Sequence, residues 1–167
     1  SQLTNVAAIY SNGAAFAALK DDGTVVTWGD IGFGSGGSGD SSSVQSQLTG
    51  VTAIFSSGKA FAALKDDGTV VTWGRPDTGG DSSIVESQLT NVAAIYSNGS
   101  AFAAIKNDGS VVTWGANSSG EDSSSVSEHL SSGVSTICST DKAFAALKSD
   151  GTVVTWGNSD YGGDSSS

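Results

Sequence analysis

The chain has 167 residues, of which 37% are hydrophobic and 14% are charged. This length is that of one domain with room for a sizeable core, and four Trp residues among regular Val and Ala runs argue against disorder. Seventeen acidic residues against seven basic ones give a net charge of −10 without any Lys or Arg cluster. That balance excludes a nucleic-acid groove and attraction to an anionic membrane surface, because both need clustered positive charge.

The sequence also carries no membrane or secretion segment. No apolar run approaches the roughly 20 residues of a spanning helix, so we predict no membrane insertion. The first ten residues lack the basic stretch and the long apolar core of a secretion signal. Because the chain contains no Met, we expect a processed product or a fragment of a longer protein.

A repeated unit organises the whole sequence. Trp recurs at positions 28, 73, 114 and 156, and Phe recurs at 16, 61, 102 and 144 with the same spacings of 45, 41 and 42 residues. The text around these anchors is nearly constant, as in AFAALKDDGTVVTWG at 15–29. We therefore divide the chain into four repeats of about 42 residues. Their approximate bounds are 1–45, 46–86, 87–127 and 128–167.

Each repeat predicts three short strands, which the first repeat shows in chain order. VAAIYS at 6–11 is apolar and has the length of a strand. AAFAALK at 14–20 follows, and Asp-Asp-Gly at 21–23 closes it. TVVTWG at 24–29 is rich in the β-branched and aromatic residues that suit a pleated surface. These three segments predict a small antiparallel meander.

The turn and the faces of these strands suggest how the units assemble. Asn12-Gly13 and Asn98-Gly99 predict tight hairpin turns, because Asn and Gly adopt the positive φ angles that such turns need. The second and third strands are apolar on both faces, as expected for a sheet covered on each side. A sheet of this kind must stack on its neighbours, which predicts a propeller or a solenoid. If the array closes into a ring, the chain ends should meet.

A polar segment with one apolar stripe connects successive repeats. Val44 and Leu48 lie four residues apart, which is the spacing of one helical face. Ser42 precedes Gln45 by three residues, as in a capping box. We therefore favour one or two helical turns here, with a fourth strand as the alternative. The same apolar pair recurs at Val85 and Leu89 and at Val126 and Leu130.

The unit VxxI…GxxAFAALKxDGxVVTWGxxxxGG resembles the repeat of the regulator-of-chromosome-condensation family. ALKDDGTVVTWG at 18–29 matches that family's strand–Asp-Gly–strand–Trp-Gly core, and ANSSG at 116–120 fits the Asn and Gly that follow it. The resemblance covers the whole chain four times and implies a β-propeller. The predicted fold class is all-β: a propeller of four repeated blades, each a three-stranded meander plus a short helical or fourth-strand segment.

The chain also departs from that family. Its members generally have seven blades, whereas four repeats are present here, so a small ring, a fragment of a larger array and a half-ring completed by a second copy all stay open. The FAALK…VVTWG text is similar to repeat arrays in large surface proteins of aquatic microbes, which implies an extracellular or cell-surface location. The family's usual His is replaced by Ala15, Ala60, Ala101 and Ala143.

The residues with reactive side chains do not form a catalytic pattern. His129 is the only His, and no Ser or Cys accompanies it with a carboxylate at a recognisable spacing, so we interpret it as a surface residue. Cys138 holds a position that is aromatic in the other repeats, which predicts a buried apolar filler. The Gly-rich run 32–39 lacks the Lys of a nucleotide loop and predicts a flexible surface insertion. We predict no enzymatic activity.

One acidic position recurs after the loop of every repeat. The carboxylate at this position, with the hydroxyl and carbonyl oxygens beside it, offers the oxygen ligands that suit Ca²⁺. A calcium loop, however, normally contains several carboxylates. A single Asp before Ser-Ser also fits a helix N-cap, which we favour over calcium, and we predict no cofactor. The residues are Asp40, Asp81, Asp122 and Asp164.

The copies differ mainly in the loops after each Trp-Gly pair, and function in a repeat scaffold lies where the copies differ. If the blades form a ring, these loops lie on one rim. Aromatic and Arg side chains there are of the types enriched in binding hot spots. The loops span 30–39, 75–80, 116–121 and 158–163. The candidate partner-binding residues are Phe33, Arg75, Asp77, Glu121, Asp160 and Tyr161.

We therefore predict a non-enzymatic binding or structural module of a secreted or cell-surface protein, which recognises a protein or glycan through these loops. One alternative is a self-assembling unit, because four similar blades expose compatible faces that can form a ring or a filament between chains. A second alternative, implied by the family resemblance alone, is an inhibitor or regulator of another protein.

Overall fold

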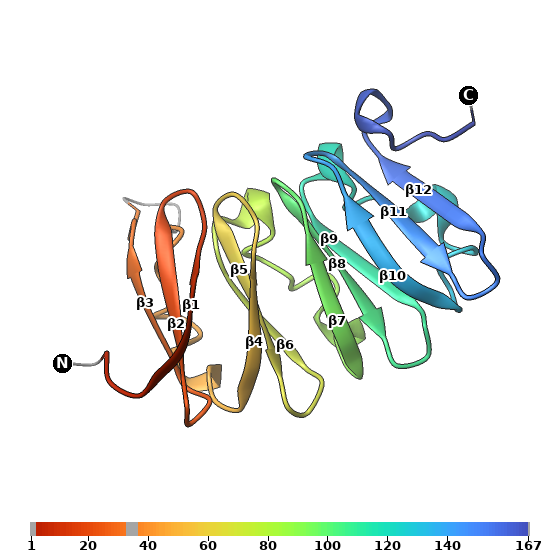
Figure 1. The fold of residues 1–167 in the computed structure, drawn as a ribbon. Helices are drawn as coiled ribbons and strands as arrows, with labels where there is room; N and C mark the ends of the chain where they lie inside the picture. Colours follow the sequence, from red (N-terminus) through yellow and green to blue (C-terminus); the bar gives the residue numbers. More distant parts are fainter. Residues whose placement is uncertain (1–2, 33–36, 167) are drawn as a thin grey trace.

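Four three-stranded antiparallel sheets stand side by side in the computed structural model, which describes residues 3–32 and 37–166 (Figure 1). We call each sheet a blade. The strands are β1 (Val6–Ser11), β2 (Ala15–Lys20) and β3 (Val25–Gly29) in the first blade, and β4 (Val51–Ser56), β5 (Ala60–Lys65) and β6 (Val70–Gly74) in the second. They are β7 (Val92–Ser97), β8 (Ala101–Lys106) and β9 (Val111–Gly115) in the third, and β10 (Val134–Ser139), β11 (Ala143–Lys148) and β12 (Val153–Gly157) in the fourth. The predicted meander is thus confirmed in every repeat.

The Phe and Trp anchors of the repeat are direct cross-strand partners. In the third blade Phe102 pairs with Trp114, and their rings stack with centroids 5.2 Å apart. The other three blades show the same stacked pair at 5.2 to 5.4 Å. Such pairing stabilises a sheet beyond the area it buries. The identical spacing of Phe and Trp in the sequence follows from this shared register.

The core lies between the blades. We call the side that carries the Phe and Trp anchors the front face, and the opposite side the back face. At the first junction Phe61 and Trp73 from the front face of the second blade pack with Ala17 and Leu19 from the back face of the first. Ala17 and Phe61 have no exposed surface. The small Ala side chains let the two sheets approach closely.

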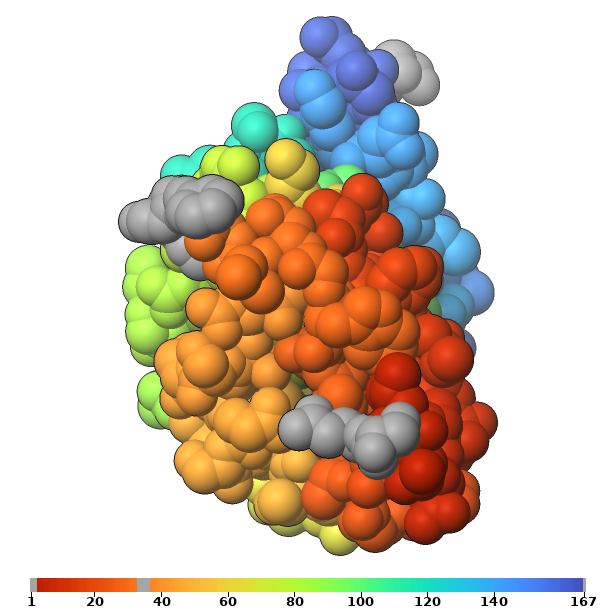
Figure 2. All heavy atoms as spheres, turned by 90° about the vertical axis from the view of Figure 1, so that its left-hand side faces the viewer, coloured from red at the N-terminus to blue at the C-terminus, as the bar shows by residue number. Residues whose placement is uncertain are grey.

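The array is open rather than closed on itself. The first blade and the N-terminus lie at one end, and the fourth blade and the C-terminus lie at the other (Figure 1). Viewed from the N-terminal end, the first blade faces the viewer and the fourth lies behind it (Figure 2). The four blades are therefore confirmed, but the chain does not close into a four-bladed ring. Two sheet faces, one at each end, have no neighbouring blade.

The linkers between blades form short 3-10 helices, which confirms the preference for helix over a fourth strand. In the first linker Leu48 is buried, and Val44 packs against the same core. The predicted capping box is wrong, because the helix has no side-chain cap; the hydroxyl of Ser41 lies 2.8 Å from that of Thr27 and donates to Oε1 of Gln45 at 3.0 Å. The helices are η1 (Gln45–Gln47), η3 (Glu86–Gln88) and η5 (Ser124–Val126).

The turn between the first two strands differs from the prediction. Neither Asn12 nor Gly13 has a positive φ angle. The side chain of Asn12 accepts hydrogen bonds from the backbone N–H groups of Ala14 and Ala15, at 2.9 and 2.8 Å. Gly13 is needed for a different reason: a Cβ there would lie 3.0 Å from the carbonyl oxygen of Gly58 in the next blade. The Asn-Gly pair therefore serves side-chain capping and close packing between blades.

Candidate binding surface

The variable loops gather along one edge of the array, beside the turns that connect the first two strands of each blade (Figure 1). We call this edge the rim. Three of the loops contain a 3-10 helix: η2 (Pro76–Thr78), η4 (Asn117–Ser119) and η6 (Ser159–Tyr161). The loop of the first blade includes residues 33–36, so the candidate Phe33 lies outside the described residues.

Each of these three loops is fixed by a side chain from the neighbouring turn of its own blade. A hydroxyl or amide group donates a hydrogen bond to the carbonyl oxygen of the last residue of the 3-10 helix. The sequence varies at both ends of this bond, but the bond itself recurs. The pairs are Ser57 with Thr78 at 2.7 Å, Asn98 with Ser119 at 2.6 Å, and Thr140 with Tyr161 at 2.8 Å. The rim thus presents differing side chains on a constant backbone.

Arg75 and Asp77 form a two-pronged ion pair on the rim of the second blade. Nε of Arg75 donates to Oδ1 of Asp77 at 3.0 Å, and Nη2 donates to Oδ2 at 2.6 Å. The hydrogen bond from Arg75 lowers the pKa of Asp77, and the same bond raises the pKa of Arg75. Both side chains remain well exposed, at 40% and 62%. A planar charged pair of this kind is available to a partner.

The rim of the fourth blade combines an aromatic ring with a cation. Nζ of Lys142 lies 4.9 Å from the centre of the Tyr161 ring, which is 41% exposed. The backbone N–H of Asp160 donates a hydrogen bond to the side chain of Asn158. The side chain of Asp160 is exposed. The structure therefore brings Asp160 and Tyr161 onto one loop.

The candidate residues do not form one cluster. Glu121 follows η4 in the third blade, and its carbonyl oxygen accepts a hydrogen bond from Thr113. The candidates therefore lie on three separate loops, in the second, third and fourth blades. The sequence analysis did not identify Lys59 and Lys142, which lie in the turns between the first two strands of their blades. These turns differ between the repeats, and that variation could have marked them as part of the binding surface. Their sequences are NGA, SGK, NGS and TDK.

The recurring acidic residues after the rim loops form local turns. Oδ1 of Asp40 accepts from the backbone N–H of Ser42 at 3.0 Å, and the other three repeat this bond at 2.9 Å. The predicted N-cap is wrong, because the residue that precedes η1 is Val44. Within residues 3–32 and 37–166, no group of three or more His, Cys, Asp or Glu is arranged to hold a metal ion. The repeated residues are Asp40, Asp81, Asp122 and Asp164.

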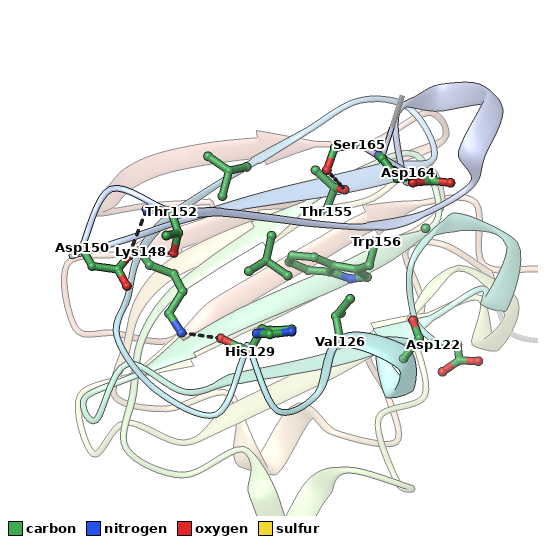
Figure 3. Close-up of a pocket in the computed structure, with 16 residues that line it drawn as sticks. Asp122, Val126, His129, Lys148, Asp150, Thr152, Thr155, Trp156, Asp164 and Ser165 are labelled. Carbon is green, nitrogen blue, oxygen red and sulfur yellow. Dashed lines mark hydrogen bonds between the residues drawn. The ribbon is translucent and has the colours of Figure 1, made fainter.

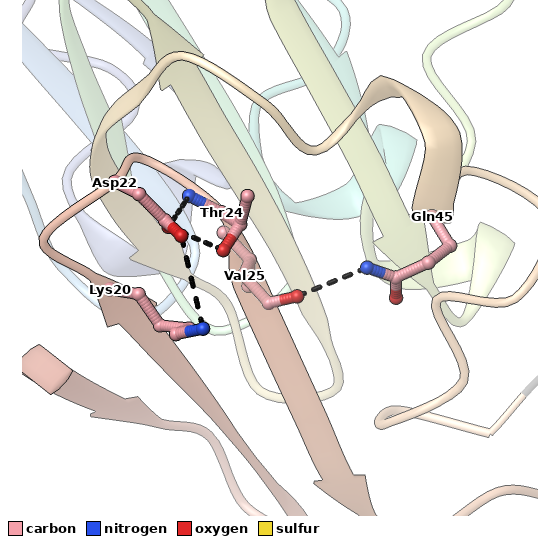
Figure 4. Close-up of polar contacts among 5 residues, drawn as sticks. All are labelled: Lys20, Asp22, Thr24, Val25 and Gln45. Atoms are coloured by element: carbon pink, nitrogen blue, oxygen red, sulfur yellow. Dashed lines mark hydrogen bonds and ion pairs between the residues drawn. The ribbon is translucent and has the colours of Figure 1, made fainter. Parts of the chain in front are cut away.

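A second set of aspartates closes the turns between the last two strands. Oδ1 of Asp22 accepts from both the hydroxyl and the backbone N–H of Thr24, at 2.6 and 3.0 Å, and Lys20 approaches its other oxygen at 3.9 Å (Figure 4). The two hydrogen bonds lower the pKa of Asp22. The equivalent residues with lowered pKa values are Asp67, Asp108 and Asp150.

These turns predict acid sensitivity. A carboxyl group whose pKa is lower in the folded state stabilises the fold above its unfolded pKa of 3.8, and this contribution is lost as the pH falls through the folded pKa. Changing all four to Asn keeps the acceptor oxygen and removes the titration. We expect the urea midpoint to fall less steeply between about pH 5 and pH 2 in this variant than in the unmodified chain. Equal slopes would contradict the assignment. The substitutions are Asp22→Asn, Asp67→Asn, Asp108→Asn and Asp150→Asn.

A groove lies between β12 and the linker that precedes the fourth blade, and it reaches Gly163 of the rim loop (Figure 3). Its volume is about 830 Å³, and His129 lines it beside Val126 and Trp156. Nζ of Lys148 donates to the carbonyl oxygen of His129 at 2.8 Å. His129 is exposed, which confirms the surface position predicted for it.

Cys138 corrects a further prediction, because it is exposed rather than buried. It lies on the back face of the fourth blade, at the position that Tyr96 holds in the third. Tyr96 packs against the core at the third junction. None of the four described blades covers Cys138. Cys138 does hold a packing position of the repeat, as predicted. It is exposed because it lies on the uncovered end face of the array.

No helix in the described ranges is long and apolar enough to cross a membrane.

Comparisons with known proteins identify the fold. No protein-family model matches the chain, and no curated protein matches it significantly in sequence. Among solved structures, yeast RCC1 (Prp20) in complex with Kap60 superposes with a TM-score of 0.62 at 17% identity, over 93% of this chain and 44% of that one. Human WBSCR16 gives 0.57 at 21% identity, over 91% and 47%. The ectodomain of the receptor kinase CR4 from Physcomitrella patens gives 0.55 at 18% identity, over 91% and 40%.

The chain thus spans less than half the length of each of these neighbours. The superpositions cover nearly all of its own residues, so all four blades share the arrangement. The chain has the repeat fold of RCC1-like β-propellers, built as an open array of four blades.

Proposed function

We propose that this chain is a non-enzymatic, protein-binding repeat module that uses its rim. The observation that carries the proposal is the contrast between constant strands and differing, well-anchored rim loops. The strands pack between blades, whereas Asp77 and Tyr161 are exposed on fixed loops and the Arg75 side chain is 40% exposed. Exposed Arg and Tyr side chains on a rigid backbone suit a protein partner, because little entropy is lost when they bind.

The structural neighbours support a protein partner over a glycan. Prp20 was solved in complex with Kap60, and its binding to Gsp1p and histones has been studied. A secreted or cell-surface location is the finer part of the proposal. It is supported by the receptor-kinase ectodomain among the neighbours and by the likeness of the repeats to microbial surface arrays.

To test whether the rim binds the partner, we compare a variant that lacks the rim ion pair with a control variant that lacks an ion pair elsewhere in the chain. Arg75→Ala with Asp77→Asn removes one positive and one negative charge from the rim. Lys65→Ala with Asp67→Asn does the same at the opposite end of β6, where Nζ of Lys65 lies 3.8 Å from Oδ2 of Asp67. All three forms are immobilised and exposed to extracts of the source cells and to secreted protein, and retained proteins are quantified.

We expect at least one protein to be retained by the unmodified chain and by the control pair, but about 10-fold less by the rim variant. Equal retention by both variants would overturn the assignment to the rim. Recovery of that partner from the secreted or the cellular fraction tests the location.

A further inference from the structure

The two end faces of the array are unpaired copies of surfaces that are buried at every internal junction. The front face of the first blade carries the same residues that the second blade buries against the first. Ile54 and Phe61 are 3% and 0% exposed, whereas their equivalents Ile9 and Phe16 are 63% and 45% exposed. Exposed apolar residues gathered on one sheet face indicate an interaction surface.

The back face of the fourth blade is the complementary surface. Leu19 and Val25 of the first blade are buried, at 7% and 1% exposure. Their equivalents in the fourth blade, Leu147 and Val153, are 42% and 58% exposed. A recess of about 130 Å³ lies on the same face, lined by Cys138, Ala143, Ala145, Tyr161 and Gly162 among others.

The three internal junctions share one hydrogen-bond register. At every internal junction the first-strand Val of one blade donates its N–H to a Gly carbonyl of the preceding blade, and a Ser hydroxyl donates to a Ser carbonyl. The Val bonds are Val51 to Gly23 at 3.0 Å, Val92 to Gly68 at 2.9 Å and Val134 to Gly109 at 3.0 Å. The Ser bonds are Ser56 to Ser11 at 2.9 Å, and Ser97 to Ser56 and Ser139 to Ser97 at 2.8 Å.

At the second and third junctions the rim loops add a further bond, which Trp73 at the first junction does not make within the described residues. Nε1 of Trp114 donates to the carbonyl oxygen of Gly79 at 3.1 Å, and Nε1 of Trp156 donates to that of Gly120 at 2.9 Å. Both glycines are in the left-handed region, and a Cβ on either would strike the Phe ring of the next blade. Gly162 has the same conformation, with φ of 92°, but a Cβ there would meet nothing within 4 Å. The fourth blade therefore keeps the shape of a junction that lacks its second half.

We infer that the front face of the first blade docks onto the back face of the fourth blade of a second copy of this chain. In that contact Trp28 donates to Gly162, as Trp114 and Trp156 do to Gly79 and Gly120. Val6 donates to Gly151 and Ser11 donates to Ser139, as their equivalents do at all three internal junctions. Because the two surfaces differ, the contact is head-to-tail. The inference goes beyond the proposed function, since it concerns the end faces and leaves the rim free.

One residue weakens the fit at the last junction. Gly13, Gly58 and Gly99 pass close to the next blade, where a Cβ would lie 2.7 to 3.1 Å from a carbonyl oxygen. Asp141 holds the equivalent position in the fourth blade, so its Cβ faces the turn at Gly13 of the second copy. We therefore expect Asp141→Gly to tighten the association.

The test measures association by sedimentation velocity across a range of chain concentrations. Phe16→Glu blocks the front face, Leu147→Glu blocks the back face, and Ile84→Glu introduces the same charge at a residue that is 89% exposed and lies on a linker. All three positions are exposed, and circular dichroism confirms that each variant is folded. We expect the unmodified chain and Ile84→Glu to associate, and each end-face variant to associate at least about 100-fold more weakly.

The decisive experiment mixes the two end-face variants. The Phe16→Glu chain keeps an intact back face, and the Leu147→Glu chain keeps an intact front face. Mixed in equal amounts, they are expected to form a pair that stops at two chains, because the remaining faces are both blocked. A monomeric unmodified chain, persistent association of either variant, or no pairing in the mixture would each overturn the inference. The rim variant at Arg75 and Asp77 should still associate, which separates this test from that of the proposed function.

Discussion

Replacing Phe102 by Ala is expected to lower the free energy of unfolding by about 3–5 kcal/mol. Phe102 has no exposed surface, stacks on Trp114, and lies in the core of the second junction. Its removal takes away buried apolar area and leaves a cavity, because neighbouring sheets cannot collapse into the space. Urea denaturation followed by Trp fluorescence measures the change.

The repeat supplies a matched control in Phe16, which has the same neighbours in its own sheet but no blade in front of it. It is 45% exposed and stacks on Trp28 at 5.3 Å. Phe16→Ala should therefore cost only about 1–2 kcal/mol. Both are measured in the Leu147→Glu background, which is expected to be monomeric. Equal losses would show that burial between blades does not determine stability.

Replacing Gly79 by Ala is expected to destabilise the chain by about 2–5 kcal/mol. Its φ angle is +96°, and a Cβ would lie 2.5 Å from a ring carbon of Phe102. The substitution therefore combines the cost of a left-handed conformation with a collision in the core of the next blade. It should also disturb the hydrogen bond from Trp114 to this glycine. The shift of the urea midpoint measures the combined effect.

Gly162 separates the two causes. It has the same left-handed conformation at the end of η6, but nothing lies within 4 Å of a Cβ placed on it. Gly162→Ala should cost only the conformational part, about 1–2 kcal/mol, in the monomeric background. If Gly79→Ala and Gly162→Ala lower stability equally, the contact with Phe102 contributes nothing. In the unmodified background Gly162→Ala should in addition weaken association, since a second copy would place Phe16 against it.

Much of the fold was predictable because the repeats compare with one another inside one chain. The recurrence of Phe and Trp divided the chain into its four blades, and the spacing of Val44 and Leu48 predicted one helical face. The Asn12-Gly13 turn was predicted at the right place with the wrong conformation. The reason is physical: short-range preference indicates a turn, whereas the neighbouring blade decides which atoms must stay small.

The candidate surface was predictable in part. Variation after each Trp-Gly pair located the rim, but not that Arg75 and Asp77 bind each other or that Lys142 lies over Tyr161. Cys138 shows the limit most clearly. Its position in the repeat is a packing position, and only its place in the last blade exposes it. Burial depends on what stands opposite a residue, which a single repeat does not encode.

The sequence by itself determined the composition of each blade, the register of its strands and the excess of acidic charge. Its low hydrophobic fraction, 37%, is sufficient because three junctions reuse one set of Ala, Val, Phe and Trp residues. Only the tertiary structure decided that the array stays open. The angle between neighbouring blades arises from contacts between sheets rather than within them. The amino-acid sequence of one repeat therefore does not determine this angle. In this open array the two complementary faces lie at opposite ends, so they cannot meet within one chain.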